Sequence, residues 1–142
     1  MNILANDGIS PSGAKALRNA GHTLHTDFVD ADHLQAFIHE NCIDGLLVRS
    51  ATKIRQPLID SCPNLKFIGR GGVGMDNIDV EYARNQGIAV FNTPAASSQS
   101  VAELVMGHLF SVARFLHNSN REMPGRGHGE FKVLKKAYGK GA

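Results

Sequence analysis

Short apolar segments alternate with amphipathic segments over the first two thirds of the chain. The apolar segments have the length and composition of strands, and they lie at residues 3–5, 22–25, 45–48, 66–68 and 88–91. The intervening segments have the apolar spacing of helices, and they lie at about residues 11–20, 31–41, 55–61 and 79–86. Alternation of strands and helices at this spacing predicts parallel strands joined by right-handed crossovers.

The third and fourth strand segments, 45–48 and 66–68, carry apolar residues with little alternation. Such strands are expected where helices cover both faces of a sheet. The sequence therefore predicts an α/β fold with a doubly wound, five-stranded parallel sheet, flavodoxin-like rather than barrel-like.

Residues typical of helix ends support these boundaries. Ser10, Asp30 and Asp79 precede three of the expected helices and are predicted to act as N-caps. Gly21 and Gly87 follow two of them, at positions where helices often end in a left-handed residue.

The pattern changes after residue 95, where one long helix is expected from Ser100 to Glu122. Ser100 and Glu103 have the spacing of a capping box. A wide apolar face follows, at positions 101, 104, 105, 109, 112 and 116. Residues 117–142 are too polar to cover this face, so we expect a fragment of a larger protein or an obligate oligomer.

Composition narrows the class of protein. Hydrophobic residues make up 42% and charged residues 20% of 142 residues, as in an ordinary globular protein. We expect a cytoplasmic protein without a membrane partner, because the sequence has neither a long apolar span nor a signal peptide. A net charge of only +2 gives no reason to expect a nucleic-acid partner. The seven histidines and two cysteines lack metal-ligand spacing, so no metal is expected.

The glycines Gly69, Gly71 and Gly74 match the G-x-G-x-x-G pattern of dinucleotide-binding loops. A loop of that kind opens a helix directly, whereas residues 75–78 intervene here. The next strand also ends at Asn92 instead of an acidic residue that could bind a ribose. The motif is therefore not expected to bind a pyrophosphate.

Several polar residues and glycines follow the expected strands and should meet at one sheet edge. Consecutive glycines at a strand end leave amides open to an anion, and ligands of doubly wound sheets lie beyond the carboxyl ends of the strands. These residues predict an anion-binding site at Arg49, Ser50, Arg70, Gly72, Val73 and Asn92. The alternative is that the glycines only turn the chain and that the arginines are solvated.

Four segments in order resemble the N-terminal part of the NAD-dependent D-isomer-specific 2-hydroxyacid dehydrogenases. They are LLVRSAT at 46–52, IGRGGVGMDNID at 68–79, VFNTP at 90–94 and SVAEL at 100–104. The resemblance implies that residues 1–95 form the flavodoxin-like substrate-binding domain. Residues 96–142 would be the entering helix and basic linker of a truncated NAD-binding (Rossmann) domain. The family's catalytic Arg, Glu and His would lie beyond this chain, which we therefore expect to be inactive alone.

The resemblance also implies site roles and an activity. The arginines would contact a substrate phosphate, the Gly72–Val73 backbone its carboxylate, and Val73 and Val101 would border the nicotinamide of NAD. Asn92 and Ser50 would line the cleft. The implied reaction is oxidation of a phosphorylated 2-hydroxy acid, D-3-phosphoglycerate, in the first step of serine biosynthesis, by a homodimer or higher oligomer. The alternatives are a dehydrogenase of glycerate, lactate or another 2-hydroxy acid, or a non-catalytic, NAD-sensing corepressor-like module.

Overall fold

The computed structural model describes residues 1–122 and 131–139, which divide into two compact units, Met1–Ala96 and Ser97–Ala142. The strands are β1 (Asn2–Ala5), β2 (Thr23–His25), β3 (Gly45–Val48), β4 (Phe67–Arg70) and β5 (Ala89–Asn92). The helices of the first unit are α1 (Pro11–Asn19), α2 (Ala31–Glu40), α3 (Gln56–Ser61) and α4 (Val80–Asn85). The second unit contains α5 (Ser98–Ala113), α6 (Leu116–Glu122) and α7 (Phe131–Tyr138).

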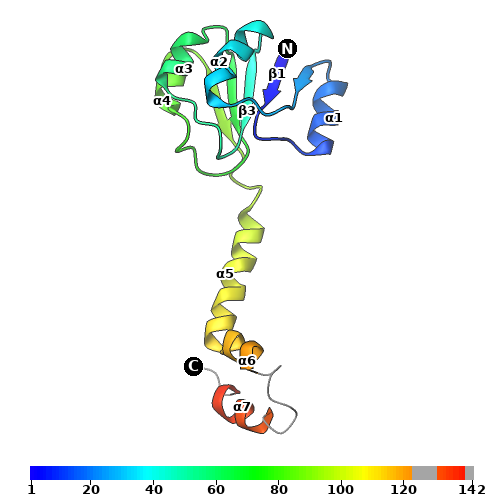
Figure 1. The fold of residues 1–142 in the computed structure, drawn as a ribbon, viewed down its shortest axis with the longest axis vertical. Coiled ribbons are helices and arrows are strands. Elements are labelled where there is room, and N and C mark those ends of the chain that lie inside the picture. Colours follow the sequence, from blue (N-terminus) through cyan, green and yellow to red (C-terminus); the bar gives the residue numbers. More distant parts are fainter. Residues whose placement is uncertain (123–130, 140–142) are drawn as a thin grey trace. The chain divides into compact units, whose positions relative to one another are not determined.

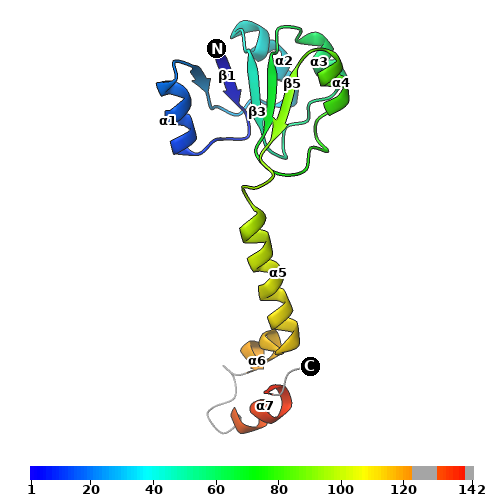
Figure 2. The same cartoon turned by 180° about the vertical axis from the view of Figure 1, so that it is seen from behind.

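The five strands form one parallel sheet in the order β2-β1-β3-β4-β5 (Figure 1). This confirms the predicted α/β fold with its doubly wound sheet. The order reverses at β1, so right-handed crossovers place α1 on one face and α2, α3 and α4 on the other. Figure 2 shows the opposite side of the sheet, where no helix lies in front of β3 and β5.

The fourth strand extends further than its apolar run. β4 continues through Gly69 and Arg70, which the apolar pattern left outside the strand. These two residues pair with Leu47 and Val48 of β3. Pairing with a neighbouring strand outweighs the weak strand preference of glycine and arginine, and this effect is invisible to local pattern.

The core lies between the sheet and helices α2, α3 and α4. Side chains from the central strands and from these helices are almost completely buried, among them Leu4, Leu34, Leu46, Ile59 and Ile68. Burial of a large aliphatic side chain contributes roughly 1.5–3 kcal/mol, so this layer holds the strand ends in fixed relative positions.

Two of the predicted N-caps form as expected. The Ser10 hydroxyl accepts a hydrogen bond from the Gly13 amide at 3.1 Å. The Asp30 carboxylate accepts bonds from the amides of Asp32 and His33.

The prediction that Asp79 caps the helix it precedes is wrong. Asp79 stands at the N-cap position of α4, but its side chain makes no capping bond there. It accepts hydrogen bonds from the Gln56 amide at 3.0 Å and the Arg55 guanidinium group at 2.8 Å, at the start of α3. The Ile54–Ile78 bridge brings the two helix starts together, and so Asp79 reaches the neighbouring helix.

The prediction of one helix from Ser100 to Glu122 is also wrong. The turn after β5 leads into a helix that begins at Ser98, so Ser100 lies inside α5 and caps nothing. Glu103 instead accepts a hydrogen bond from the Gln99 side chain. The helix ends at Ala113 because Phe115 adopts a left-handed conformation (φ 52°), and α6 follows as a separate element.

No residue of α5 is buried within the described structure, and its large apolar side chains are all exposed. Among the described residues, no helix has both the length and the apolar character needed to cross a membrane. Part of the expected basic linker, residues 123–130 and 140–142, lies outside the described residues.

Candidate functional site

The carboxyl ends of three adjacent strands meet in one row. Val48 of β3, Arg70 of β4 and Asn92 of β5 are cross-strand partners, and Arg49 follows Val48 directly. The structure therefore brings the predicted residues of β3, β4 and β5 to one sheet edge. We call the following set the strand-end site: Arg49, Ser50, Arg70, Gly72, Val73 and Asn92.

The backbone that carries Arg49 is held from two sides. The Asp7 carboxylate accepts hydrogen bonds from the amides of Arg49 (2.6 Å) and Thr52 (3.1 Å) and from the Thr52 hydroxyl. The Asn77 side chain donates to the carbonyls of Arg49 (2.8 Å) and Thr52 (2.6 Å). With both ends of this short loop fixed, the exposed Arg49 side chain starts from a defined position.

Asp7 carries a negative charge in this arrangement. Partial burial by itself would raise the pKa of this carboxyl group, but the hydrogen bonds from Thr52 and the Arg49 amide outweigh it and lower the pKa below its ordinary value. The ionised carboxylate is the form that accepts all these bonds, so the loop geometry depends on its charge.

The glycine segment after β4 is less open than the sequence indicated. The Gly71 amide donates to the Val48 carbonyl at 2.8 Å. The Gly72 amide donates to the Arg70 carbonyl at 3.0 Å and to the Thr93 hydroxyl at 2.9 Å. The expectation of an open Gly72 amide is therefore wrong, because Thr93, which directly follows β5, supplies an internal acceptor.

The amides of Val73 and Gly74 make no hydrogen bond with the described part of the chain, so they are the donors that remain for an anion. The Val73 carbonyl already has an internal partner, because it accepts a hydrogen bond of 2.6 Å from the Asn92 side chain. Asn92 thus orients the glycine segment, which a reading of its motif position did not indicate.

Both arginine side chains lie along this segment. A Cβ atom at Gly71 would be 3.5 Å from Cγ of Arg49, and one at Gly72 would overlap Nη1 of Arg70. Arg70 is half-buried, and its buried Nε atom has no hydrogen-bond partner in the described structure. A buried donor without a partner is costly, and an anion between Arg70 and the glycine segment would satisfy it. Guanidinium groups bind carboxylates and phosphates with paired hydrogen bonds.

The other predicted residues are placed as follows. Ser50 is exposed at the strand-end site, and its side chain makes no hydrogen bond with the described residues. Val73 exposes 53% of its surface there, which leaves an apolar side chain beside the open amides. Val101 lies on α5 in the second unit and is 55% exposed.

The structure also agrees with the argument against pyrophosphate binding by the glycine motif. Helix α4 begins at Val80, well after Gly74, so the loop does not open a helix. Three positioning residues, Asp7, Asn77 and Thr93, were missed by the sequence reasoning. Each follows a strand or a glycine segment, which is a weak signal, and their partners are distant in the sequence.

This fold is an α/β domain with a parallel sheet, and the residues predicted to bind an anion lie at the carboxyl ends of its strands. Residues 3–138 match the model of the D-isomer specific 2-hydroxyacid dehydrogenase catalytic domain. The chain belongs to the D-isomer specific 2-hydroxyacid dehydrogenase family and corresponds to its N-terminal region.

Two curated relatives show what share of a relative's length the chain covers. It is 40% identical over 134 residues to a hydroxypyruvate reductase of Thermotoga maritima, covering 94% of this chain and 43% of the relative. It is 39% identical over 140 residues to a D-3-phosphoglycerate dehydrogenase of Methanocaldococcus jannaschii, covering 97% of this chain and 26% of the relative. The chain thus spans less than half the length of either relative.

Solved structures agree with this assignment. The TT0316 protein of Thermus thermophilus matches with a TM-score of 0.76 and 25% identity, over 92% of this chain and 44% of the other. An NAD+-bound 3-phosphoglycerate dehydrogenase of Entamoeba histolytica matches with a TM-score of 0.63 and 30% identity, over 80% of this chain and 39% of the other.

Proposed function

We propose that this chain is the substrate-binding part of an NAD-dependent dehydrogenase that oxidises D-3-phosphoglycerate to 3-phosphohydroxypyruvate. The observation that carries the proposal is the position of two arginines, Arg49 and Arg70, at the ends of adjacent strands beside one glycine segment. A substrate with both a phosphate and a carboxylate presents two anionic groups, and this edge offers donors for both.

In this proposal the two guanidinium groups bind the phosphate, and the open amides of Val73 and Gly74 bind the carboxylate. Fixing both ends of a short substrate orients the C–H bond between them. A bound NAD would supply the hydride acceptor for that carbon. The exposed Val73 side chain fits the apolar edge of a nicotinamide, and Val101 is proposed to border the same ring. The proton-transferring residues would lie on a part of the protein outside this chain.

A second candidate is a hydroxypyruvate reductase, and the 40% identical Thermotoga maritima relative is the observation that favours it. Its substrate lacks a phosphate, so one arginine would be free of the substrate. A dehydrogenase of another unphosphorylated 2-hydroxy acid, such as lactate, would likewise leave one arginine free of the substrate. A non-catalytic NAD-sensing module would bind neither phosphorylated nor unphosphorylated acids.

Calorimetric titration of the 142-residue chain with 3-phosphoglycerate, D-glycerate and hydroxypyruvate separates these candidates. We expect 3-phosphoglycerate to bind about tenfold more tightly than D-glycerate, since charge-assisted hydrogen bonds to the phosphate are added. Arg70→Met should reduce that preference, because Arg49 alone would remain to bind the phosphate, and Arg18→Met on α1 should leave it unchanged. Equal binding of all three acids would favour the reductase, and no binding of any would favour the non-catalytic module.

Turnover tests the same proposal on a longer protein that contains this chain together with its NAD-binding part. The ratio of kcat/KM for 3-phosphoglycerate to that for glycerate should fall in the Arg70→Met variant, whereas Arg18→Met should preserve it. The 142-residue chain alone should show no NAD reduction with either acid.

We also propose that helix α5 is a self-association surface. Its exposed large apolar side chains are Val101, Leu104, Val105, Met106, Leu109, Phe110 and Val112. An apolar surface of this extent is unusual for a monomer in water. Sedimentation velocity should show a dimer or higher oligomer, and a Leu104→Lys, Leu109→Lys variant should shift it toward monomer.

A further inference from the structure

A concave region lies on the same unit as the strand-end site, and none of the six strand-end residues lines it. This cavity encloses about 340 Å³, within the range of small-ligand pockets. Its walls come from the starts of α2 and α3 and from the loops that follow β1, β2 and β3. We call it the switch-point pocket.

The position of this pocket in the sheet is significant. β1 lies between β2 and β3 in the sheet, and the chain leaves β1 and β3 toward opposite faces. In doubly wound sheets a crevice opens at such a reversal, and ligands of this fold class bind in it. Asn6 follows β1 and the segment 51–53 follows β3, so both sides of the reversal line the pocket.

The pocket walls are mainly apolar. Leu34 of α2 and Pro57 and Leu58 of α3 contribute aliphatic surface. Phe28 stands at the rim with 67% of its surface exposed to solvent. A ligand with an apolar body would cover this ring and so gain the free energy of removing it from water.

The polar floor of the pocket offers no further hydrogen bonds. The Asn6 side chain donates to the Thr52 hydroxyl (2.8 Å) and the Val29 carbonyl (3.0 Å), and it accepts from the Val29 amide (2.8 Å). The Thr52 hydroxyl in turn donates to Asp7. Because these groups satisfy one another, the floor is rigid and selects against a strongly polar ligand body.

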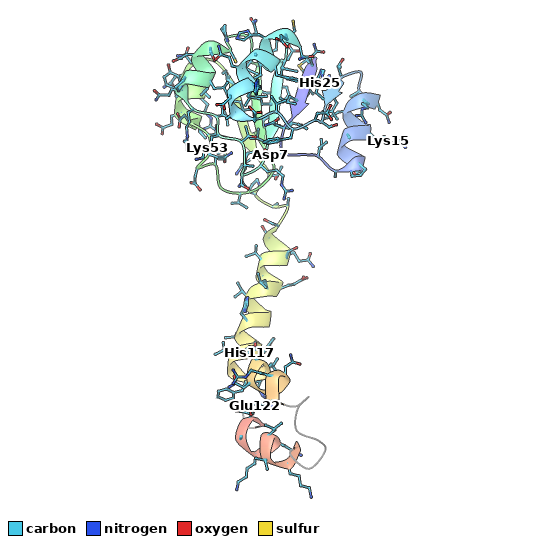
Figure 3. All side chains as sticks on the ribbon, in the orientation of Figure 1. Asp7, Lys15, His25, Lys53, His117 and Glu122 are labelled. Atoms are coloured by element: carbon cyan, nitrogen blue, oxygen red, sulfur yellow. The ribbon has the colours of Figure 1, made fainter. Side chains whose placement is uncertain are left out.

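One charge remains available at the rim. The Arg55 guanidinium group binds Asp79 and the Asp76 carbonyl, and the Asp30 carboxylate caps α2. Lys53 makes no hydrogen bond or ion pair with residues 1–122 or 131–139. Figure 3 labels Lys53 and Asp7 at the same end of the first unit, whereas Lys15 projects from α1.

We propose that the switch-point pocket binds a small apolar monocarboxylate, with its body against Phe28 and Leu58 and its carboxylate at Lys53. This chemistry differs from that of the strand-end site, which offers two arginines and open amides to a more highly charged anion. The ligand would contact Thr52 and Lys53 of the loop that also carries Arg49. Its binding therefore acts on the anchor points that position Arg49.

Binding of 3-phenylpropionate to the 142-residue chain tests this site, with its neutral amide, 3-phenylpropanamide, as the matched ligand. In ¹⁵N-correlated NMR spectra we expect 3-phenylpropionate to shift the amides of Phe28, Thr52 and Lys53. Lys53→Met should weaken binding about fivefold, as should removal of the charge in the amide ligand, since an exposed charge pair is lost. Lys15→Met is the control and should bind as the unchanged chain does.

A second variant, Leu58→Trp, fills the pocket and should abolish binding while the Lys15 and α1 signals keep their positions. Absence of shifts, shifts confined to residues 70–74, or equal weakening by Lys15→Met would overturn the proposal. Because no turnover or phosphoglycerate binding is measured, failure here is distinct from failure of the proposed function.

Discussion

Arg70 occupies the space that a side chain at position 72 would need. Gly72 has a φ of 148°, a conformation that other residues rarely adopt, and a Cβ atom there would overlap Nη1 of Arg70. Glycine at position 72 therefore leaves room for the Arg70 guanidinium group and also allows the chain to turn there.

Gly72→Ala should displace the Arg70 guanidinium group. We expect a loss of about 1–2 kcal/mol in the free energy of unfolding from backbone strain, together with weaker binding of 3-phosphoglycerate. Gly8→Ala is the control, because Gly8 also has a positive φ (83°) but has open space around it. Urea unfolding should show a loss in both variants, and calorimetry should show weaker binding in Gly72→Ala alone. Equal binding by the two variants would contradict the role of Gly72.

Asp7→Asn should loosen the loop that carries Arg49. The neutral amide cannot accept all the hydrogen bonds that the carboxylate accepts, so we expect a loss of about 1 kcal/mol in unfolding free energy near neutral pH. Asp27→Asn is the control, since Asp27 is exposed and should change stability by less than about 0.5 kcal/mol. Chemical unfolding followed by circular dichroism measures both.

The pH dependence of that loss has a definite sign. Because folding lowers the pKa of Asp7 below 3.8, its stabilisation is fully present above that value and disappears as the pH falls through the lowered pKa. The difference in unfolding free energy between the unchanged chain and Asp7→Asn should therefore be constant from pH 7 to 5 and shrink below about pH 4. A difference that grew as the pH fell would contradict this.

Gly45→Ala should disturb a cross-strand pair. Gly45 and Phe67 are partners in β3 and β4, and a Cβ atom at Gly45 would overlap the Phe67 ring. We expect a loss of about 1–3 kcal/mol from overpacking. A Gly45→Ala, Phe67→Leu double variant should recover part of it, because the two effects are coupled. Gly107→Ala on α5 has open space and should not destabilise the protein.

Asp79→Ala should destabilise the start of α3 rather than that of α4. The lost acceptor serves the Gln56 amide and the Arg55 guanidinium group, and loss of an N-cap typically costs about 1 kcal/mol. Hydrogen exchange should accelerate at Leu58 and Ile59 and change little at Ala83 and Arg84. Asp79→Asn, which keeps an acceptor, should lose less. Faster exchange confined to α4 would show that Asp79 caps its own helix.

Much of the fold could be predicted because it depends on neighbours in the chain. Ser10 and Asp30 cap the helices that they directly precede, and such short contacts are set by residue type and spacing. The positions of Arg49, Arg70 and Asn92 at one edge also followed from strand pattern, because parallel strands end on the same side.

The detailed state of the candidate site could not be predicted, because its hydrogen bonds join residues far apart in the sequence. Thr93, directly after β5, accepts a hydrogen bond from the Gly72 amide, and Asn92 donates one to the Val73 carbonyl. Asp7 accepts one from the Arg49 amide, 42 residues away. Nothing in the local pattern around these residues distinguishes an amide that is open to a ligand from one that has an internal acceptor.

The sequence by itself determined the parallel sheet, the helices between its strands and the edge on which the arginines lie. These properties follow from the period of apolar residues and the handedness of the crossovers, which act within one strand–helix–strand unit. The tertiary structure alone decided that Val73 and Gly74 keep open amides, that Asp79 serves a neighbouring helix and that a pocket opens between α2 and α3. These depend on which side chains meet after the strands are aligned side by side, and that alignment is a property of the whole sheet.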